Sequence, residues 1–275
     1  MNRITVRDLS FSYTKDIPIL KKLNLEIDDR KTAIVGQNGA GKTTFVKLLK
    51  GLLKPVSGKI LINGTDVSSV TVAELSKQVG MVFQNPDDQI FKNKIIDEVM
   101  FGPINIFKDK EKARENAVKA LEIVGMVDKL EESPYDLGLS ERKLISIASV
   151  LAMENEIIIL DEPTIAQDSW GKRRIGEIIN RLRDQGKLVI TIIHDMDFVA
   201  DYFERVIVLR HGEVYLDGTA QEVFAQSEKI REAYLELPHV AQLSTMENDE
   251  VRITIRDYVE AKRGKNEKNG PVKAL

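Results

Sequence analysis

The sequence predicts an α/β fold built around a parallel β-sheet that helices cover on both faces. Residues 157–160 and 188–193 are apolar almost throughout, and a helical pattern around residues 174–183 separates them. A strand without a polar side must be buried on both faces, and strands that alternate with helices pair in parallel. About the first 100 residues differ, because alternating apolar positions such as Ile4 and Val6 predict short strands and turns.

Composition excludes several classes of protein. The 275 residues include 40 Lys and Arg against 43 Asp and Glu, and this net charge of −3 argues against a broad basic surface for nucleic acid. There is no cysteine, which excludes disulfides, thiolate metal sites and a cysteine nucleophile. No apolar run approaches the ~20 residues of a membrane span, so we expect a cytoplasmic location and contact with a membrane only through partners.

Helical segments follow the short strands. The apolar spacing over residues 110–124 predicts a helix that ends at Gly125, and a second helix is expected at 142–153. Residues 205–210 and 213–216 predict an antiparallel hairpin at the sheet edge. Beyond Ala220 the pattern predicts short amphipathic helices, one of them over 228–237, and then an unstructured tail from Lys262 onward.

The strongest motif is a glycine-rich loop at residues 36–44, which fits G-x-x-x-x-G-K-[ST] between an apolar strand at 32–35 and a helix at 43–49. Its backbone N–H groups are expected to hold phosphate, Lys42 to neutralise the β- and γ-phosphates, and the Thr43 hydroxyl to ligate Mg²⁺. The predicted nucleotide-binding residues of the loop are Gly36, Asn38, Gly39, Ala40, Gly41, Lys42, Thr43 and Thr44.

Two carboxylates, Asp161 and Glu162, follow the apolar segment 157–160. They therefore stand at the carboxyl end of a buried strand, where ligands bind in sheets of this kind. Asp161 is predicted to ligate Mg²⁺, and Glu162 to orient or deprotonate the attacking water.

Three further residues are candidates for the same site. His194 directly follows the segment 188–193 and could contact the γ-phosphate and the water held by Glu162. The amide of Gln84 could reach Mg²⁺ or that water, although a turn-capping role is the alternative. Tyr13 could stack on adenine or be an ordinary aromatic at a strand end.

In this order, the residues resemble those of ATP-binding-cassette (ABC) ATPases between about residues 4 and 220. The stretches 84–91 and 97–105 are similar to the ATPase subunits of energy-coupling-factor (ECF) transporters, which power vitamin or transition-metal uptake in prokaryotes. The resemblance implies a P-loop NTPase core with an antiparallel β-subdomain and a helical subdomain at about 85–155, together forming a nucleotide-binding domain over 1–220. A C-terminal helical extension at 221–262, used by the family for dimer contact, and a flexible tail at 263–275 follow.

The same resemblance implies an ATP-hydrolysing subunit at the cytoplasmic face of a prokaryotic membrane, with ATP and Mg²⁺ bound. Its expected partners are a second ATPase subunit, a transmembrane coupling subunit and a substrate-binding membrane subunit. Two alternatives stay open. One is a soluble cassette protein that acts on DNA or the ribosome, and the other is an assembly subunit that binds ATP with little hydrolysis.

The sequence departs from the family at its signature motif, Leu-Ser-Gly-Gly-Gln. At the usual spacing from Asp161 the equivalent stretch is 137–141. Its serine is missing at the second place, where Gly138 stands, Leu139 replaces a glycine and Glu141 replaces the Gln; a rival register begins at Leu139. Leu139 would crowd a phosphate, and Glu141 would add negative charge beside it. Residues 165–168 also lack the Leu usual before Asp168. These departures predict a heterodimer with a cassette whose signature is intact.

Overall fold

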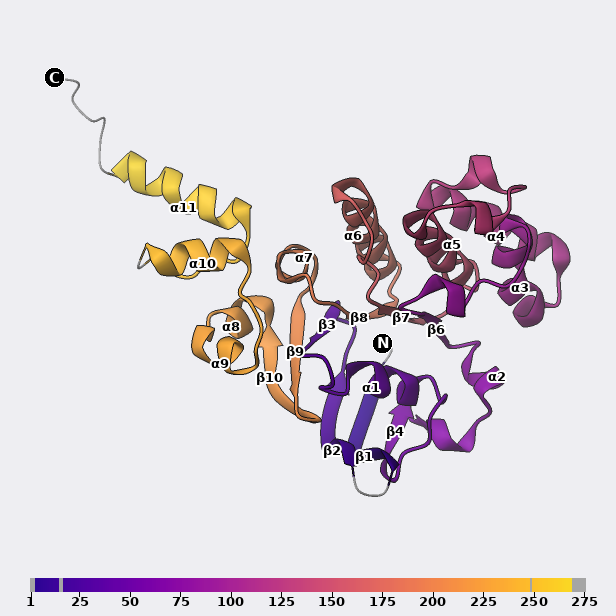
Figure 1. Cartoon of the computed structure of the whole chain (residues 1–275), viewed down its shortest axis with the longest axis horizontal. Coiled ribbons are helices and arrows are strands. Elements are labelled where there is room, and N and C mark those ends of the chain that lie inside the picture. Colours follow the sequence, from indigo (N-terminus) through magenta and orange to yellow (C-terminus); the bar gives the residue numbers. More distant parts are fainter. Residues whose placement is uncertain (1–2, 15–16, 248, 269–275) are drawn as a thin grey trace.

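A central β-sheet organises the protein, seen here in a computed structural model that describes residues 3–14, 17–247 and 249–268. Within those residues the sheet has six strands: β3 (Thr32–Val35), β6 (Val79–Val82), β7 (Ile157–Asp161), β8 (Leu188–Ile192), β9 (Arg205–Arg210) and β10 (Glu213–Thr219). Their order is β10-β9-β3-β8-β7-β6 (Figure 1). All neighbours are parallel except the edge strand β10, which pairs antiparallel with β9. The predicted α/β class and the edge hairpin are confirmed.

A second, antiparallel sheet is built from the N-terminal part of the chain. Its strands are β1 (Ile4–Thr14), β2 (Ile17–Ile27), β4 (Ser57–Ile62) and β5 (Thr65–Asp66), in the order β2-β1-β4-β5. The apolar positions of β1 skip from Val6 to Leu9, which breaks a strict alternation. A bulge with Asp8 at φ 47° explains the skip, because the extra residue returns Leu9 to the buried face.

Helix α1 (Lys42–Leu49) packs between the two sheets. It follows β3 directly, and its buried Phe45 and Leu49 share one core with Ile157 and Ile159 of β7. The intervening residues Ile158 and Leu160 belong to a separate core on the opposite face of the same sheet. The expected two-sided burial of the strand at 157–160 is therefore confirmed.

Helices on that opposite face come from two parts of the chain. The helices between β6 and β7 gather at one end of the molecule, and α6 and α7 lie along the sheet (Figure 1). Besides α1, the helices up to β9 are α2 (Val72–Leu75), α3 (Ile95–Phe107), α4 (Lys110–Val124), α5 (Leu139–Leu151), α6 (Ser169–Asp184) and α7 (Met196–Tyr202), with short 3₁₀ turns at Val67–Ser69, Pro86–Asp88, Val127–Lys129 and Pro134–Asp136. Of these, α2 belongs with α1, because its buried Leu75 lies in the same core. Helix α4 ends at Gly125 as predicted. Helix α5 begins three residues earlier than predicted, because Glu141 caps its first turn by accepting a hydrogen bond from the backbone N–H of Gly138 (3.3 Å).

The C-terminal helices lie at the end of the molecule away from α3 and α4 (Figure 1). They are α8 (Ala220–Phe224), α9 (Ser227–Glu232), α10 (His239–Met246) and α11 (Ile255–Lys268). The helix predicted over 228–237 is wrong beyond Glu232, because Tyr234 adopts a left-handed conformation (φ 55°) that ends it. None of the helices in the described ranges is both long and apolar enough to cross a bilayer.

The predicted unstructured tail is also wrong as far as Lys268, where α11 ends. Two side-chain contacts hold α11 against the end of α10. The Tyr258 hydroxyl donates to Glu247 (3.0 Å), and the Lys262 ammonium pairs with the same carboxylate (2.6 Å). The rest of the predicted tail, residues 269–275, lies outside the described residues.

Candidate functional site

The glycine-rich loop connects β3 to α1 and has a backbone that only glycine can adopt at two positions. At Gly36 (φ 154°) a Cβ atom would lie 2.3 Å from the Leu209 carbonyl oxygen of β9. At Gly41 (φ 98°) a Cβ would lie 2.6 Å from the Leu20 side chain. These two glycines therefore allow the loop to pass close to its neighbours before α1 begins, and the positive end of the α1 dipole faces the loop.

Lys42 is the cation of this loop, and its side chain folds back over it. The ammonium donates to the carbonyl oxygens of Gly36 (2.6 Å) and Gln37 (3.2 Å). Burial lowers the pKa of Lys42, while the nearby Glu162 and Asp161 carboxylates act in the opposite direction. A phosphate could replace the two carbonyl contacts, because an ammonium on a flexible stem can turn toward a stronger acceptor.

A cavity of about 290 Å³ opens beside the loop and collects most of the predicted site residues. Residues from five separate parts of the chain meet there. The lining residues are Tyr13, Ile19, Asn38, Gly39, Gly41, Lys42, Thr43, Thr44, Gln84, Glu162 and His194. Asp161 lines an adjoining cavity together with Thr43 and Gln84. The predicted Gly36 and Ala40 are not among the lining residues of either cavity.

The environment of Asp161 fits a divalent cation. Its Oδ1 atom is buried and, among the described residues, has no hydrogen-bond partner. Burial raises the pKa of this carboxyl to about 6 and Glu162 adds to the rise, whereas Lys143 and a hydrogen bond with Thr43 oppose it. A buried oxygen without a partner, beside a hydroxyl and the amide of Gln84, is a donor set that suits Mg²⁺.

Glu162 and His194 are in direct contact. His194 Nε2 lies 3.0 Å from Glu162 Oε1, and the Glu162 backbone N–H donates to the Ile192 carbonyl oxygen (3.0 Å). The Glu162 side chain is 5% exposed and that of His194 is 44% exposed. The carboxylate is therefore held in the protein interior, and the imidazole projects into the cavity. Glu162 also has a left-handed backbone (φ 50°), which is costly for a residue with a Cβ and directs its side chain away from the strand.

Sequence reasoning missed Lys143, a buried residue of α5. Its ammonium donates to three carbonyl oxygens, those of Phe83 (2.8 Å), Gln84 (2.7 Å) and Asp161 (3.2 Å). These contacts tie the segment after β6 to the end of β7, and so fix the backbone from which Gln84 and Asp161 project. Burial lowers the pKa of Lys143 to about 8. The signal available in the sequence was the position of Lys143 on an otherwise apolar helix face, where a lysine has no evident partner among its neighbours in the chain.

Tyr13 lies at the open side of the cavity. Its ring is 61% exposed, packs edge-to-face on Phe11, and places its hydroxyl 3.4 Å from Thr44 Oγ1. A broad exposed ring face beside the phosphate loop is compatible with stacking on a base, which stays a prediction.

The segment aligned with the signature forms the N-terminus of α5. Leu139 is 40% exposed there. The Glu141 carboxylate pairs with Lys129 (2.5 Å), which lowers the Glu141 pKa and neutralises the charge that the sequence predicted beside a phosphate. The Ser140 hydroxyl donates to Gln167 Oε1 (3.0 Å) in the same chain. The polar side chains of this turn are thus engaged within the subunit.

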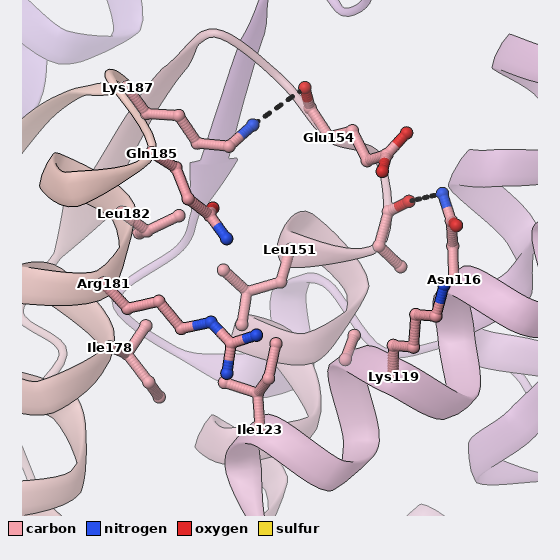
Figure 2. Close-up of a pocket in the computed structure, with 12 residues that line it drawn as sticks. Asn116, Lys119, Ile123, Leu151, Glu154, Ile178, Arg181, Leu182, Gln185 and Lys187 are labelled. Carbon is pink, nitrogen blue, oxygen red and sulfur yellow. Dashed lines mark hydrogen bonds between the residues drawn. The ribbon is translucent and has the colours of Figure 1, made fainter.

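A separate cavity of about 320 Å³ lies where α4, the end of α5 and α6 meet (Figure 2). Hydrogen bonds close its rim, from Lys187 Nζ to the Glu154 carbonyl oxygen (3.0 Å) and from Asn116 Nδ2 to that of Ala152 (3.3 Å). It shares no lining residue with the phosphate-loop cavity and contains none of the predicted site residues. The predicted catalytic and binding residues therefore lie around the phosphate loop and not at this second cavity.

The fold and this site define a phosphate-loop ATPase of the cassette type. Residues 20–165 match the sequence model of the family described as ABC transporter. The chain belongs to the ABC transporter family, and as an ABC ATPase it binds ATP.

Relatives with this sequence pattern include ECF transporter proteins. The chain is 39% identical over 243 residues to the energy-coupling factor transporter ATP-binding protein EcfA of Methanothermobacter thermautotrophicus, covering 87% of this chain and 78% of that protein. It is 37% identical over 250 residues to EcfA2 of Caldanaerobacter subterraneus, covering 88% and 87%. A Methanosarcina acetivorans protein named as an ABC transporter ATP-binding protein is 41% identical over 242 residues, and this chain spans 39% of its length.

Solved structures with this fold are ABC cassettes. The structure of cbiO1 from Clostridium perfringens, part of the ABC transporter complex cbiONQ, superposes with a TM-score of 0.75 at 33% identity, covering 88% of this chain and 98% of that one. The cassette MJ0796, solved as a dimer in a post-hydrolysis state bound to ADP and Pi, gives a TM-score of 0.73 at 26% identity, covering 79% and 98%.

Proposed function

We propose that this chain is the ATP-hydrolysing subunit of an ECF-type importer, which powers the uptake of a vitamin or a transition-metal ion through membrane partners. The observation that carries the proposal is the single cavity in which Lys42, Glu162 and His194 meet at the end of the parallel sheet. The similarity to proteins named EcfA supports the ECF type.

ATP binding would rest on the loop and the N-terminus of α1. The loop backbone and Lys42 would surround the β- and γ-phosphates, and Tyr13 would cover the base. Thr43, Gln84 and Asp161 would hold Mg²⁺, which supplies charge neutralisation on the phosphate oxygens. The buried Asp161 Oδ1 without a partner supports that assignment.

Hydrolysis would depend on the contact between Glu162 and His194. The Glu162 carboxylate would accept a hydrogen bond from the attacking water and orient it toward the γ-phosphate. His194, half-exposed at the cavity, would donate from Nε2 to one carboxylate oxygen and so fix Glu162 beside the γ-phosphate. A group positioned in this way favours a hydrolysing subunit over one that only binds ATP, because binding alone needs no carboxylate beside the phosphates.

An exposed apolar surface on the helical subdomain fits a docking site for the transmembrane coupling subunit. Phe91 and Phe101 pack edge-to-face with ring centroids 4.8 Å apart, and both rings are about half exposed. The Lys92 ammonium lies over both rings, at 5.0 and 5.2 Å from their centroids. Ile104 adds further exposed apolar area nearby on α3. This surface, called the Phe91–Phe101 surface below, follows Gln84 in the chain, so it could relay changes at the nucleotide.

A second cassette would complete the active assembly. The C-terminal extension would contribute to that contact, because α10 and α11 leave apolar side chains exposed, among them Leu243, Met246, Ile255 and Val259. The assembly would then sit at the cytoplasmic face of a prokaryotic membrane, and a separate membrane subunit would choose the solute.

Membrane association of point variants tests the proposal. The tagged full chain is expressed in its own cells, membranes are washed, and both retained protein and ATP hydrolysis are measured. We expect Phe91→Ala/Phe101→Ala to lower retention about tenfold or more, because two exposed aromatic anchors are lost. The control Val56→Ala, exposed on the other subdomain, should be retained like the unaltered chain. Equal retention of all three proteins would contradict the docking site, and no ATP hydrolysis in any membrane fraction would contradict the function.

A further inference from the structure

Two departures from the family pattern lie far apart in the sequence and meet in the structure. Ser140 stands in the altered signature turn, and Gln167 stands where a Leu is usual. The Ser140 hydroxyl donates to Gln167 Oε1 (3.0 Å), and Gln167 Nε2 donates back to the Ser140 carbonyl oxygen (3.1 Å). One amide thus forms two hydrogen bonds with one residue. The two altered residues are therefore hydrogen-bond partners of each other.

Burial makes this pair significant. Gln167 is only 9% exposed, so its amide would lose solvation without a matching partner. Space for the amide comes from Gly171 in the first turn of α6, where a Cβ atom would lie 2.2 Å from Gln167 Oε1. The surroundings of the Gln167 amide are therefore built from Ser140 of α5 and Gly171 of α6.

The segment that carries Gln167 begins at Glu162. Both Glu162 (φ 50°) and Ala166 (φ 61°) have left-handed backbones, which residues with a Cβ adopt only when their surroundings hold them. Asp168 fixes the far end of the segment by capping α6, through a hydrogen bond from the Gly171 N–H (2.7 Å). Gln167, next to Asp168, ties the same end of the segment to α5 through Ser140.

We propose that Gln167 is a positioning residue for hydrolysis, which holds the segment 162–168 against the first turn of α5 through Ser140 and so fixes the Glu162 carboxylate. The inference rests on the proposed function, because it assumes that Glu162 orients the attacking water. It adds that the placement of Glu162 depends on the position of α5, a helix of the subdomain that carries the Phe91–Phe101 surface.

The first experiment compares Gln167→Ala, Ser140→Ala and the double variant as full chains with their co-purified membrane partners. We expect Gln167→Ala to lower kcat about tenfold or more with KM for ATP unchanged within twofold, because the general base is misplaced while the phosphate loop is intact. The double variant should be no slower than Gln167→Ala, since Gln167→Ala already removes both hydrogen bonds of the pair, including the one that Ser140→Ala removes. The control Gln185→Ala, exposed at the far end of α6, should hydrolyse ATP normally.

A second variant tests the contact from its other side. Gly171→Ala in the unaltered chain should displace the Gln167 amide and lower kcat as Gln167→Ala does. In the Gln167→Ala background the same substitution should have no further effect on kcat, because there is no amide to displace. Circular dichroism and the melting temperature of each variant show that it is folded.

The outcomes separate this inference from the function on which it rests. If Glu162→Gln abolishes hydrolysis while kcat of Gln167→Ala stays within twofold, the positioning role is wrong and the proposed function stands. A lower melting temperature of Gln167→Ala with unchanged kcat at 25 °C also overturns it, as does an equal effect of Gly171→Ala in both backgrounds. If Glu162→Gln hydrolyses ATP normally, the proposed function and this inference both fail.

Discussion

His194 Nε2 lies 3.0 Å from Glu162 Oε1, although the two residues are 32 positions apart. Each follows one of two neighbouring parallel strands, β7 and β8, and the Glu162 backbone is bonded to Ile192 of β8. The carboxyl ends of adjacent parallel strands thus bring a carboxylate and an imidazole together beside the phosphate loop. One oxygen of the carboxylate is engaged by His194, which leaves the other for a water molecule.

The first prediction concerns Glu162. We expect Glu162→Gln to retain ATP binding and to slow hydrolysis by about 10²–10³-fold, or ~2.7–4 kcal/mol of barrier, because an amide orients water poorly and takes no proton. Binding of a fluorescent ATP analogue and phosphate release measure the two effects separately. His194→Ala in the same background should add little, since the pair acts as a unit. Unchanged turnover of Glu162→Gln would assign the water to another group.

The second prediction concerns Lys42. Lys42→Ala removes the buried cation that faces the loop, so nucleotide affinity should fall by at least about tenfold. Lys54→Ala, exposed and five residues beyond the end of the same helix, is the matched control. Titration with ATP in the presence and absence of Mg²⁺ measures the loss. Equal affinities of the two variants would reject the phosphate-loop assignment.

Most of the sequence predictions rested on short local patterns. The phosphate loop lies within nine consecutive residues, so its motif and flanking strand and helix were sufficient to find it. The grouping of Glu162 with His194 followed from the rule for carboxyl ends of parallel strands. Lys143 could not be found in this way, because its three acceptors are backbone carbonyls, which no side-chain pattern marks.

Long-range contacts explain the other differences. Composition predicted a disordered tail, but Glu247 at the end of α10 holds Tyr258 and Lys262 of α11. Similarly, Glu141 was expected to repel a phosphate, and its partner Lys129 is twelve residues earlier in a 3₁₀ turn. In each case the deciding partner belongs to an element whose position depends on the tertiary fold.

The third prediction tests Lys143. Lys143→Met removes the donor of three carbonyl oxygens, and the buried one, that of Asp161, should cost about 1–3 kcal/mol when it is left unsatisfied. Urea unfolding should show the loss, and Lys143→Arg should restore part of it. We also expect Lys143→Met to need a higher Mg²⁺ concentration for half-maximal hydrolysis, because Gln84 and Asp161 lose their common anchor. Exposed Lys119→Met is the control, and a stability equal to that control would show that the ammonium is not structural.

The fourth prediction concerns the pH dependence of stability. Lys50 ends α1 with its ammonium buried against Ser76 Oγ (3.0 Å) and the Val79 carbonyl oxygen, and burial lowers its pKa to about 8. Between pH 8 and the unfolded-state pKa near 10.5, the unfolded chain binds a proton that the folded chain does not. The free energy of unfolding should therefore rise with pH in this window, by about 2 kcal/mol from pH 7.5 to 10 for this residue.

Urea unfolding at the two pH values measures that contribution. Lys50→Met should show a smaller rise than the unaltered chain, whereas exposed Lys54→Met should show the full rise. An equal rise in both variants would mean that Lys50 is not the buried base responsible.

The last prediction follows from the first turn of α5. In a head-to-tail pair of cassettes, each ATP would meet the phosphate loop of one chain and this turn of the other. Here the turn presents Leu139, while the Ser140 hydroxyl is bonded to Gln167 and Glu141 is paired with Lys129. Loss of one hydrogen-bond donor to a developing charge costs about 3 kcal/mol, or on the order of 10²-fold in rate. We therefore expect the isolated chain to hydrolyse ATP at least tenfold more slowly per site than its complex with a second cassette.

A repaired turn provides the sharper test of this asymmetry. Gly138→Ser, Leu139→Gly, Ser140→Gly and Glu141→Gln together recreate the family's signature in this chain. If the turn is the deficient half-site, the repaired chain should gain ATPase activity without a partner, and the gain should vanish when Lys42→Ala is added. The substitution Ser140→Gly also releases Gln167, so Gln167→Leu is included to fill the vacated space. The gain is measured against a chain that carries Ser140→Gly and Gln167→Leu alone, since loss of that pair lowers kcat by itself. An isolated natural chain that is already as active as its complex would show that the altered turn serves a partner's ATP as well as the usual sequence does.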